Sequence, residues 1–135
     1  MLPLLKIRAI RCVSVEIPMT YALGTSRGTL TKAPLLLVDL ETVEGITGHS
    51  YIWCYFPAVL PALTSIIAEV ERVVVGSNVA PLDLWRRLAE RFALIGIQGI
   101  VRMAMSGFDT AAWDALATGQ RSTRKGKSST ALAPT

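Results

Sequence analysis

The chain has 135 residues, of which 51% are hydrophobic, and its mean hydropathy is +0.44, so it can bury a core as one domain and is not disordered as a whole. Its formal charge of +4 arises after residue 118, because residues 1–118 contain ten basic and ten acidic side chains. A neutral folded part excludes a basic nucleic-acid-binding face on that part.

The N-terminal residues and the cysteines indicate in which cellular compartment the protein is expected. Basic residues interrupt the apolar residues near the N-terminus, which is unlike a secretory signal. The longest apolar run, residues 57–68, is too short for a bilayer and contains Pro57 and Pro61, so no membrane-spanning helix is predicted. With Cys12 and Cys54 as the two cysteines, reduced thiols and a cytoplasmic location are expected.

The first half of the chain has the period of β-strands. Residues 5–17 alternate, and their apolar members are predicted to share one face: Leu5, Ile7, Ala9, Val13, Val15 and Ile17. Pro18 ends this strand, and residues 19–32, which are rich in Gly and Thr, are predicted to form a loop. Two further strands over residues 35–40 and 46–53 complete a three-stranded antiparallel β-meander.

Three aromatic residues at the end of the third strand, Tyr51, Trp53 and Tyr55, share one face by alternation. The simplest expectation is that they cover the helices. Tyr55 lies where the strand becomes a loop. It is therefore the aromatic residue that we expect to leave the core.

The second half of the chain has a period near 3.6 residues. A helix is predicted from about residue 59 to Gly76, a shorter one follows Pro81, and a third begins at Ile100. Strands first and helices afterwards indicate an α+β domain, with about three α-helices packed on one face of the meander. An interior glycine costs a helix about 1 kcal/mol relative to alanine, so Gly107 indicates that another element packs closely against it. It belongs to a row of small residues on the third helix: Ala104, Gly107, Ala111 and Ala115.

The composition changes abruptly near residue 118. Residues 118–135 are rich in Ser, Thr, Lys, Arg and Gly, and almost nothing before Leu132 could be buried. The sequence therefore predicts one domain over residues 1–117, followed by a basic, disordered tail over residues 118–135.

The titratable residues do not combine into a catalytic centre. His49 is the only histidine, and its position in a strand favours a structural role. Asp109 and Asp114 lie about 140° apart around a helix, so they cannot hold one ligand together, and capping or hydrogen bonds to a neighbouring element are expected. A stand-alone enzyme that uses His49 remains an alternative, and it predicts turnover that His49→Ala abolishes.

Five short motifs stand in order along the chain: APLLLVD at 33–39, GHSY at 48–51, RF at 91–92, RMA at 102–104 and DTAAWDAL at 109–116. Each motif is weak alone, but the ordered set is specific. Over residues 5–117 the chain resembles the N-terminal capping domain of the mandelate racemase / muconate lactonizing enzyme family of the enolase superfamily, and most closely the mandelate racemase group.

The resemblance implies a cap that closes over the mouth of a (β/α)-barrel. In the family, lysine or histidine bases of the barrel take the proton α to the carboxylate of a small hydroxy acid, and Mg²⁺ held by three acids stabilises the enediolate. Racemase, isomerase and dehydratase activities follow from this chemistry. The resemblance therefore implies a barrel domain as partner and no catalytic residue, metal ligand or cofactor in this chain. A barrel needs about 200 further residues.

By position, the resemblance also implies that residues 21–30 form a loop over the active site. The residues that match family substrate contacts are Leu23, Thr25, Arg27, Leu30 and Tyr55. Arg27 departs from the family pattern, because the matching place in mandelate racemase is apolar and helps to enclose an aromatic ring. An arginine there favours a more polar or acidic substrate, unless it is a solvated side chain at a loop tip.

Two interpretations follow from the change of composition at Thr118. In the first, the chain is a truncated or frameshifted fragment of a longer reading frame and is inactive alone, and whether it is itself an enzyme stays open. In the second, it is a non-enzymatic interaction module or a self-associating domain, whose apolar faces meet another protein or a second copy. A soluble homo-oligomer favours the module, whereas aggregation without a barrel favours the fragment.

Overall fold

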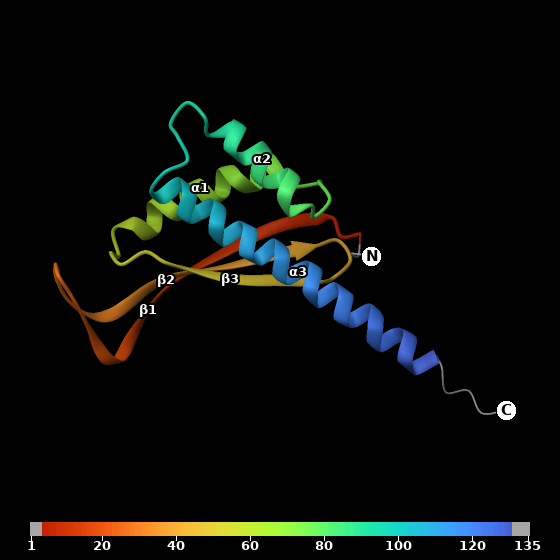
Figure 1. Ribbon diagram of the computed structural model, residues 1–135, viewed down its shortest axis with the longest axis horizontal. Helices are drawn as coiled ribbons and strands as arrows, with labels where there is room; N and C mark the ends of the chain where they lie inside the picture. Colours follow the sequence, from red (N-terminus) through yellow and green to blue (C-terminus); the bar gives the residue numbers. More distant parts are fainter. Residues whose placement is uncertain (1–3, 131–135) are drawn as a thin grey trace.

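The computed structural model describes residues 4–130, and the side chains of residues 4–126 (Figure 1). The strands form one antiparallel sheet in the order β1-β2-β3. The α+β prediction of a three-stranded meander followed by three helices is confirmed. The elements, in chain order, are β1 Ile7–Thr25, β2 Gly28–Thr42, β3 Thr47–Trp53, α1 Val59–Val74, α2 Pro81–Arg91 and α3 Ile100–Thr130.

The core lies between one face of the sheet and the helices α1 and α3. On the central strand β2, Leu36, Val38 and Leu40 are fully buried, and the residues between them point to the other face. The helix α1 meets them with a buried stripe at helical spacing: Leu60, Leu63, Ile67, Val70 and Val74. The shorter helix α2 packs on α1 and α3 rather than on the sheet.

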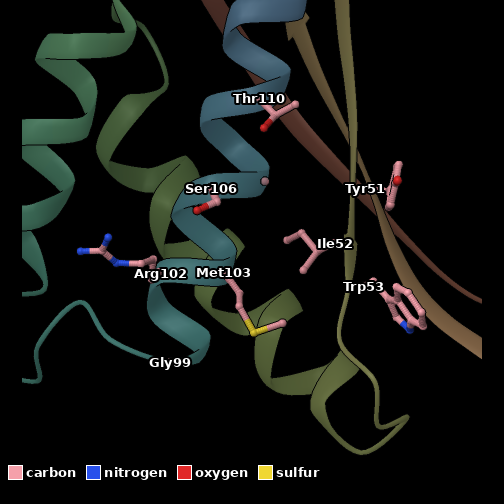
Figure 2. A pocket seen from close by; sticks show the side chains of 9 residues that line it. Tyr51, Ile52, Trp53, Gly99, Arg102, Met103, Ser106 and Thr110 are labelled. Atoms are coloured by element: carbon pink, nitrogen blue, oxygen red, sulfur yellow. The ribbon is translucent and has the colours of Figure 1, made fainter. Parts of the chain in front are cut away.

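The small residues of α3 let β3 approach the helix closely. The Ile52 side chain points from β3 toward α3 (Figure 2), and a Cβ added to Gly107 would lie 2.5 Å from Ile52 Cδ1. A Cβ added to Gly48 would overlap the carbonyl oxygen of Ala111. The Ser50 hydroxyl donates a hydrogen bond of 2.6 Å to the Gly107 carbonyl. The predicted close packing against Gly107 is therefore confirmed.

The predicted face of β1 is wrong beyond its first residues. The pairing of β1 with β2 shifts between Ile7 and Ala9, which is a β-bulge. An extra residue in one strand turns every later side chain to the opposite face. Ile10 is consequently buried, whereas Val13 is 58% exposed. Val15 also lies on the face away from the helices, because its partner in the register is the outward-facing Leu35.

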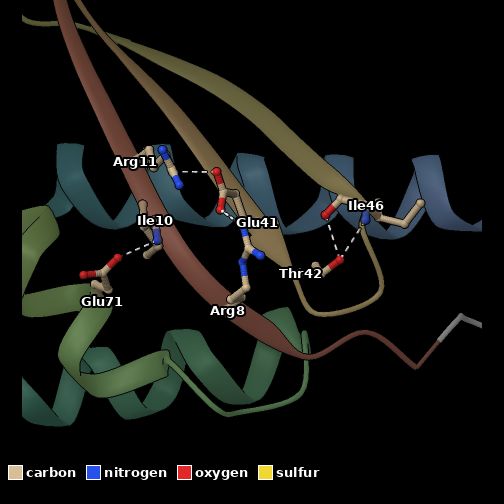
Figure 3. Close-up of polar contacts among 7 residues, drawn as sticks. All are labelled: Arg8, Ile10, Arg11, Glu41, Thr42, Ile46 and Glu71. Carbon is tan, nitrogen blue, oxygen red and sulfur yellow. Dashed lines mark hydrogen bonds and ion pairs between the residues drawn. The ribbon is translucent and has the colours of Figure 1, made fainter.

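Ion pairs and hydrogen bonds hold the start of β1 in place (Figure 3). Arg8 Nη2 and Arg11 Nε lie 2.7 Å and 2.6 Å from the carboxylate of Glu41. The hydrogen bond from Arg8, with the charges of both arginines, holds the pKa of Glu41 below its ordinary value. The Ile10 amide donates to Glu71 Oε2 at 2.6 Å, which ties β1 to α1.

The helix α3 continues to Thr130, which differs from the prediction of a disordered tail beginning at residue 118. The described side chains beyond Gly119 are exposed, so packing ends there although the helix does not. Gln, Arg and Lys favour helices, and no proline that could end the helix occurs before Pro134. Residues 131–135 of the predicted tail lie outside the described residues. In the part of the chain that is described, no helix is both long and apolar enough to cross a membrane.

Candidate functional site

The ends of β1 and β2 form a two-stranded ribbon that reaches beyond the rest of the sheet (Figure 1). Residues 19–32 belong to this ribbon, so the prediction of a loop is wrong. Leu23 lies opposite Leu30, after an irregularity in the pairing that begins at Pro18, where the strand lacks an amide donor. The many threonines of this segment, which signalled a loop by composition, are β-branched and suit a strand equally well.

A tight turn closes the ribbon. Thr25 pairs with Gly28, whose φ of 145° is accessible to glycine at little cost. The Thr25 hydroxyl donates to the Gly28 carbonyl at 2.7 Å and accepts a hydrogen bond of 3.2 Å from the Arg27 amide. These contacts place Arg27 at the tip of the ribbon.

A cavity of about 300 Å³ lies between the ribbon tip and the segment that follows β3. Four of the five residues that the sequence analysis associates with substrate are part of its wall. The fifth, Leu23, is outside the lining and faces solvent in part, opposite Leu30. The wall consists of Thr25, Arg27, Gly28, Thr29, Leu30, Tyr55 and Phe56.

Tyr55 has an unusual backbone conformation in this wall. Its φ is 63°, the left-handed region that non-glycine residues rarely adopt, and the Phe56 amide donates to the Cys54 carbonyl across it at 2.7 Å. Its ring stacks on Trp53 with centroids 4.8 Å apart and an interplanar angle of 17°. Tyr55 is 48% exposed and therefore lies outside the core as predicted, but Tyr51, which was not singled out, is more exposed at 67%. Backbone strain of this kind clusters at active sites and ligand-binding sites.

The cavity carries one formal charge, that of Arg27. In the part of the chain that the structure describes, no carboxylate lies within ion-pairing distance of the Arg27 guanidinium. The remaining wall supplies threonine hydroxyls, two aromatic rings and a leucine. This arrangement can bind and orient a small polar molecule, but it contains no acid–base pair that could carry out proton transfer.

A second cavity, of about 360 Å³, lies between the edge of β3 and α3 (Figure 2). Arg102, Ser106 and Thr110 line it from α3, and the sequence analysis did not single them out as a group. The spacing of four residues between them could have indicated this group in the sequence, because it places the three side chains on one side of a helix. Tyr51 and Trp53 lie on the other side of β3 from Ile52, so the expectation that these aromatic residues cover the helices is wrong.

Asp114 contacts a neighbouring element, as the sequence analysis expected for it and for Asp109, and a structural role of the His49 ring stays a prediction. The Asp114 carboxylate accepts a hydrogen bond of 2.8 Å from the His49 amide and so joins α3 to β3. The His49 ring lies 2.7 Å from Asp39 Oδ1 on the exposed side of the sheet. Asp109 lies separately on α3, where burial raises the pKa of its carboxyl group.

The acids and histidine do not gather into a metal site. Within residues 4–130, no three side chains of His, Cys, Asp or Glu converge as metal ligands. The described residues therefore do not form a ligand set for the Mg²⁺ that the resemblance implies for the complete enzyme.

A three-stranded antiparallel meander followed by three helices is the architecture of an enolase-type N-terminal domain. The family model described as "Mandelate racemase / muconate lactonizing enzyme, N-terminal domain" matches residues 7–123. The chain belongs to this family. The match extends past residue 117, where the sequence analysis ended the resemblance.

Solved structures agree with this membership. An enolase from Bradyrhizobium, complexed with magnesium and mandelic acid, is 36% identical, with a TM-score of 0.81, over 91% of this chain and 34% of that chain. An enolase from alpha proteobacterium BAL199 with bound magnesium is 28% identical, with a TM-score of 0.80, over 86% of this chain and 32% of that chain. The chain thus spans about a third of the length of the proteins that it matches.

More distant relatives share the fold. L-Talarate dehydratase from Polaromonas sp. JS666, complexed with magnesium and L-glucarate, is 23% identical, with a TM-score of 0.70, over 86% of this chain and 32% of that chain. At this identity the likeness concerns the fold alone. The same three strands and three helices therefore occur in proteins whose bound ligands differ.

Proposed function

We propose that this chain is a substrate-capping domain that closes over the active site of a (β/α)-barrel partner. The enzyme so formed removes the proton α to the carboxylate of a small hydroxy acid, as a racemase, isomerase or dehydratase. The observation that carries the proposal is the cavity at the end of the sheet. Thr25, Arg27, Leu30 and Tyr55, from two segments about thirty residues apart, meet there.

The chemistry is divided between cap and barrel in this proposal. The cavity of the cap holds a cation, hydroxyls and aromatic rings but no base, so the barrel supplies the groups that move the proton. Magnesium, which the Bradyrhizobium protein contains together with mandelic acid, would likewise be held by the barrel. The cap binds the distal part of the substrate and excludes water, and the chain alone is inactive.

The cap also sets the substrate preference in this proposal. Arg27 has no carboxylate partner among the described residues, and a substrate with a negative or polar distal group would supply one. An aryl substrate would leave the guanidinium without a partner in a closed site. We therefore assign a polar or acidic hydroxy acid to this chain, in preference to an aryl one.

A fusion protein tests the proposal. Residues 1–117 are joined to the Bradyrhizobium protein from the position that aligns with Thr118 onward, so that no part of the shared helix is lost. Exchange of the α-hydrogen for deuterium is followed by NMR with mandelate and with hydroxy dicarboxylates. We expect exchange with at least one dicarboxylate. The absence of exchange with every substrate, while the unmodified Bradyrhizobium protein exchanges mandelate, would contradict the proposal.

The role of Arg27 is tested in the same fusion. Arg27→Leu is expected to lower kcat/KM for the dicarboxylate by at least about tenfold relative to mandelate, because a charge-assisted hydrogen bond is lost. Arg86→Leu is the matched control, since Arg86 lies exposed on α2 beside Asp83 and away from the cavity. An equal effect of the two substitutions would remove Arg27 from the proposed site.

The domain boundary and the compartment belong to the same proposal. We take residues 1–117 as the cap and residues 118–135 as a basic extension, because the described side chains beyond Gly119 make little contact with the core. We also assign the protein to the cytoplasm. The free thiols of Cys12 and Cys54 support this assignment, since unpaired cysteines are usual in a reducing compartment.

A further inference from the structure

The cavity of about 360 Å³ between the edge of β3 and α3 has no part in the proposed capping role (Figure 2). It is larger than the cavity of about 300 Å³ at the end of the sheet, and the two cavities are lined by different residues. Arg102, Ser106 and Thr110 of α3 line it on one side, and Tyr51 and Trp53 of β3 line it on the other. Polar groups from two elements thus meet around one space.

Among the described lining residues, Arg102 alone carries a formal charge. Its Nε donates a long hydrogen bond of 3.3 Å to the Ile97 carbonyl, and this bond leaves both terminal nitrogens of the guanidinium group without a partner in residues 4–126. No carboxylate of the same residues lies within ion-pairing distance of it. The two terminal nitrogens can therefore donate a pair of parallel hydrogen bonds to one carboxylate or phosphate group.

Two hydroxyl groups beside Arg102 are free to bind a ligand. A serine or threonine inside a helix can donate to the carbonyl group four residues earlier. Thr64 and Thr123 do so, each at 3.0 Å. Among the side chains that the structure describes, Ser106 and Thr110 have no such bond and no other hydrogen-bond partner. Because they follow Arg102 at intervals of four residues, the three side chains form one row along α3.

The opposite side of the cavity adds main-chain groups. Alternate residues of an antiparallel edge strand direct their amides away from the neighbouring strand. The His49 amide points away from β2, since it donates to Asp114, so the amides of Tyr51 and Trp53 point to the same open edge. In the part of the chain that is described, these two amides have no hydrogen-bond partner, and the buried indole nitrogen of Trp53 has none either. Buried polar groups are normally paired, so an acceptor is missing here.

We propose that this cavity binds a small oxyanion, a carboxylate or a phosphate group, between the Arg102 guanidinium and the open edge of β3. Each unpaired side chain named above can donate a hydrogen bond, and the described lining contains no acidic side chain that would repel an anion. The edge also presents the neutral carbonyl groups of β3, so the charge of Arg102 sets the sign of the ligand. Because Arg102 is exposed, water competes for it, and a dissociation constant on the order of 1 mM is expected.

Two-dimensional amide NMR of the full 135-residue chain tests the proposal. Sodium phosphate and sodium acetate are titrated separately at constant pH, and sodium chloride at matched ionic strength is the reference. The expected result is a saturable shift of the Tyr51 and Trp53 amide resonances with phosphate, with acetate or with both. The Asp83 amide on α2 should show no saturable shift. The anion that saturates the shift identifies the ligand as a phosphate or a carboxylate group.

Two substitutions test the residues of the site. Arg102→Gln should raise the dissociation constant at least about tenfold, because a charge-assisted pair of hydrogen bonds is lost, and Ser106→Ala should raise it about threefold. Arg86→Gln is the matched control, since Arg86 pairs with Asp83 on α2 and lies outside the lining. A dispersed amide spectrum shows that each variant is folded.

Two results would overturn the proposal. One is an equal shift of the Tyr51 and Trp53 amides with chloride, which would mean that ionic strength alone moves them. The other is undiminished binding in both Arg102→Gln and Ser106→Ala. Neither measurement involves turnover or a barrel partner, so the outcome is separate from that of the capping proposal.

Discussion

Gly48 on β3 lies directly against the backbone of Ala111 on α3. A Cβ on Gly48 would overlap the Ala111 carbonyl oxygen and stand 2.7 Å from the Ala115 amide nitrogen. A helix backbone cannot move aside as the end of a flexible side chain can. The distance between β3 and α3 is therefore set by the absence of a side chain at Gly48.

Gly48→Ala is accordingly expected to destabilise the domain by about 1–3 kcal/mol, since overpacking against backbone forces the two elements apart. The free energy of unfolding, measured by urea denaturation, checks this. The matched control is Gly24→Ala, because no atom lies within 4 Å of a Cβ at Gly24. A loss at Gly48 no larger than the loss at Gly24 would show that the packing of β3 on α3 is wrong.

Asp114→Ala is expected to lower the free energy of unfolding by about 1.5–3 kcal/mol, the usual range for a hydrogen bond to a charged group. The Asp114 carboxylate accepts from the His49 amide at 2.8 Å, across two elements. Asp83→Ala serves as the control, because Asp83 pairs with Arg86 on the exposed surface of a single helix. Asp114→Ala should lose clearly more free energy of unfolding than Asp83→Ala. An equally small loss in both variants would show that Asp114 does not join α3 to β3.

Asp109 predicts a pH dependence of stability. Burial raises the pKa of its carboxyl group in the folded chain above the ordinary value of 3.8. The stability contributed by this group is therefore fully present below that value and is lost as the pH rises through the folded pKa. Asp109→Asn cannot ionise, so the variant should gain stability relative to the original chain as the pH rises from about 3 to about 7.

Urea denaturation of both proteins at several pH values measures this difference. The comparison uses the difference in free energy of unfolding between the two proteins. The arginine partners lower the pKa of Glu41 and Glu69, so the stability that these two residues contribute rises with pH. This rise is the same in both proteins and therefore cancels in the difference. A constant difference across the range would mean that Asp109 is not desolvated.

Cys12 is expected to react slowly with alkylating agents. Burial, and secondarily the charges of Glu71 and Asp39, raise the pKa of its thiol to about 11. The thiolate fraction at pH 8 is then roughly a hundredfold below that of an ordinary cysteine. Mass spectrometry after iodoacetamide treatment should show Cys12 largely unmodified in the folded chain and quickly modified in urea. Equal rates in the two conditions would place Cys12 on the surface.

The order of elements and part of the packing could be predicted from sequence. The spacing of apolar residues, with the glycines and prolines between the segments, indicated each strand and helix. The cost of a glycine inside a helix indicated that another element packs closely against Gly107. The bulge after Ile7 could not be predicted, because alternation is a local pattern and the shift depends on pairing with β2. The extent of α3 was misjudged because polar composition indicates weak packing and does not by itself end a helix.

The candidate site was only partly predictable. The residues of the cavity follow from the resemblance to a family, and no local pattern brings Thr25 near Tyr55. The ribbon was interpreted as a loop because its threonines fit both states, and the tight turn at Arg27 depends on side-chain hydrogen bonds. The left-handed conformation of Tyr55 has no signal in the sequence, since its cause is the turn that joins β3 to α1.

Amide hydrogen exchange in the fusion protein tests the capping role most directly. The fusion of residues 1–117 with the Bradyrhizobium segment is measured with and without a hydroxy acid that it turns over. If the ribbon and Tyr55 close on substrate, exchange in residues 19–32 slows when substrate binds, while exchange in α2 does not change. Turnover with unchanged exchange in residues 19–32 would contradict the account.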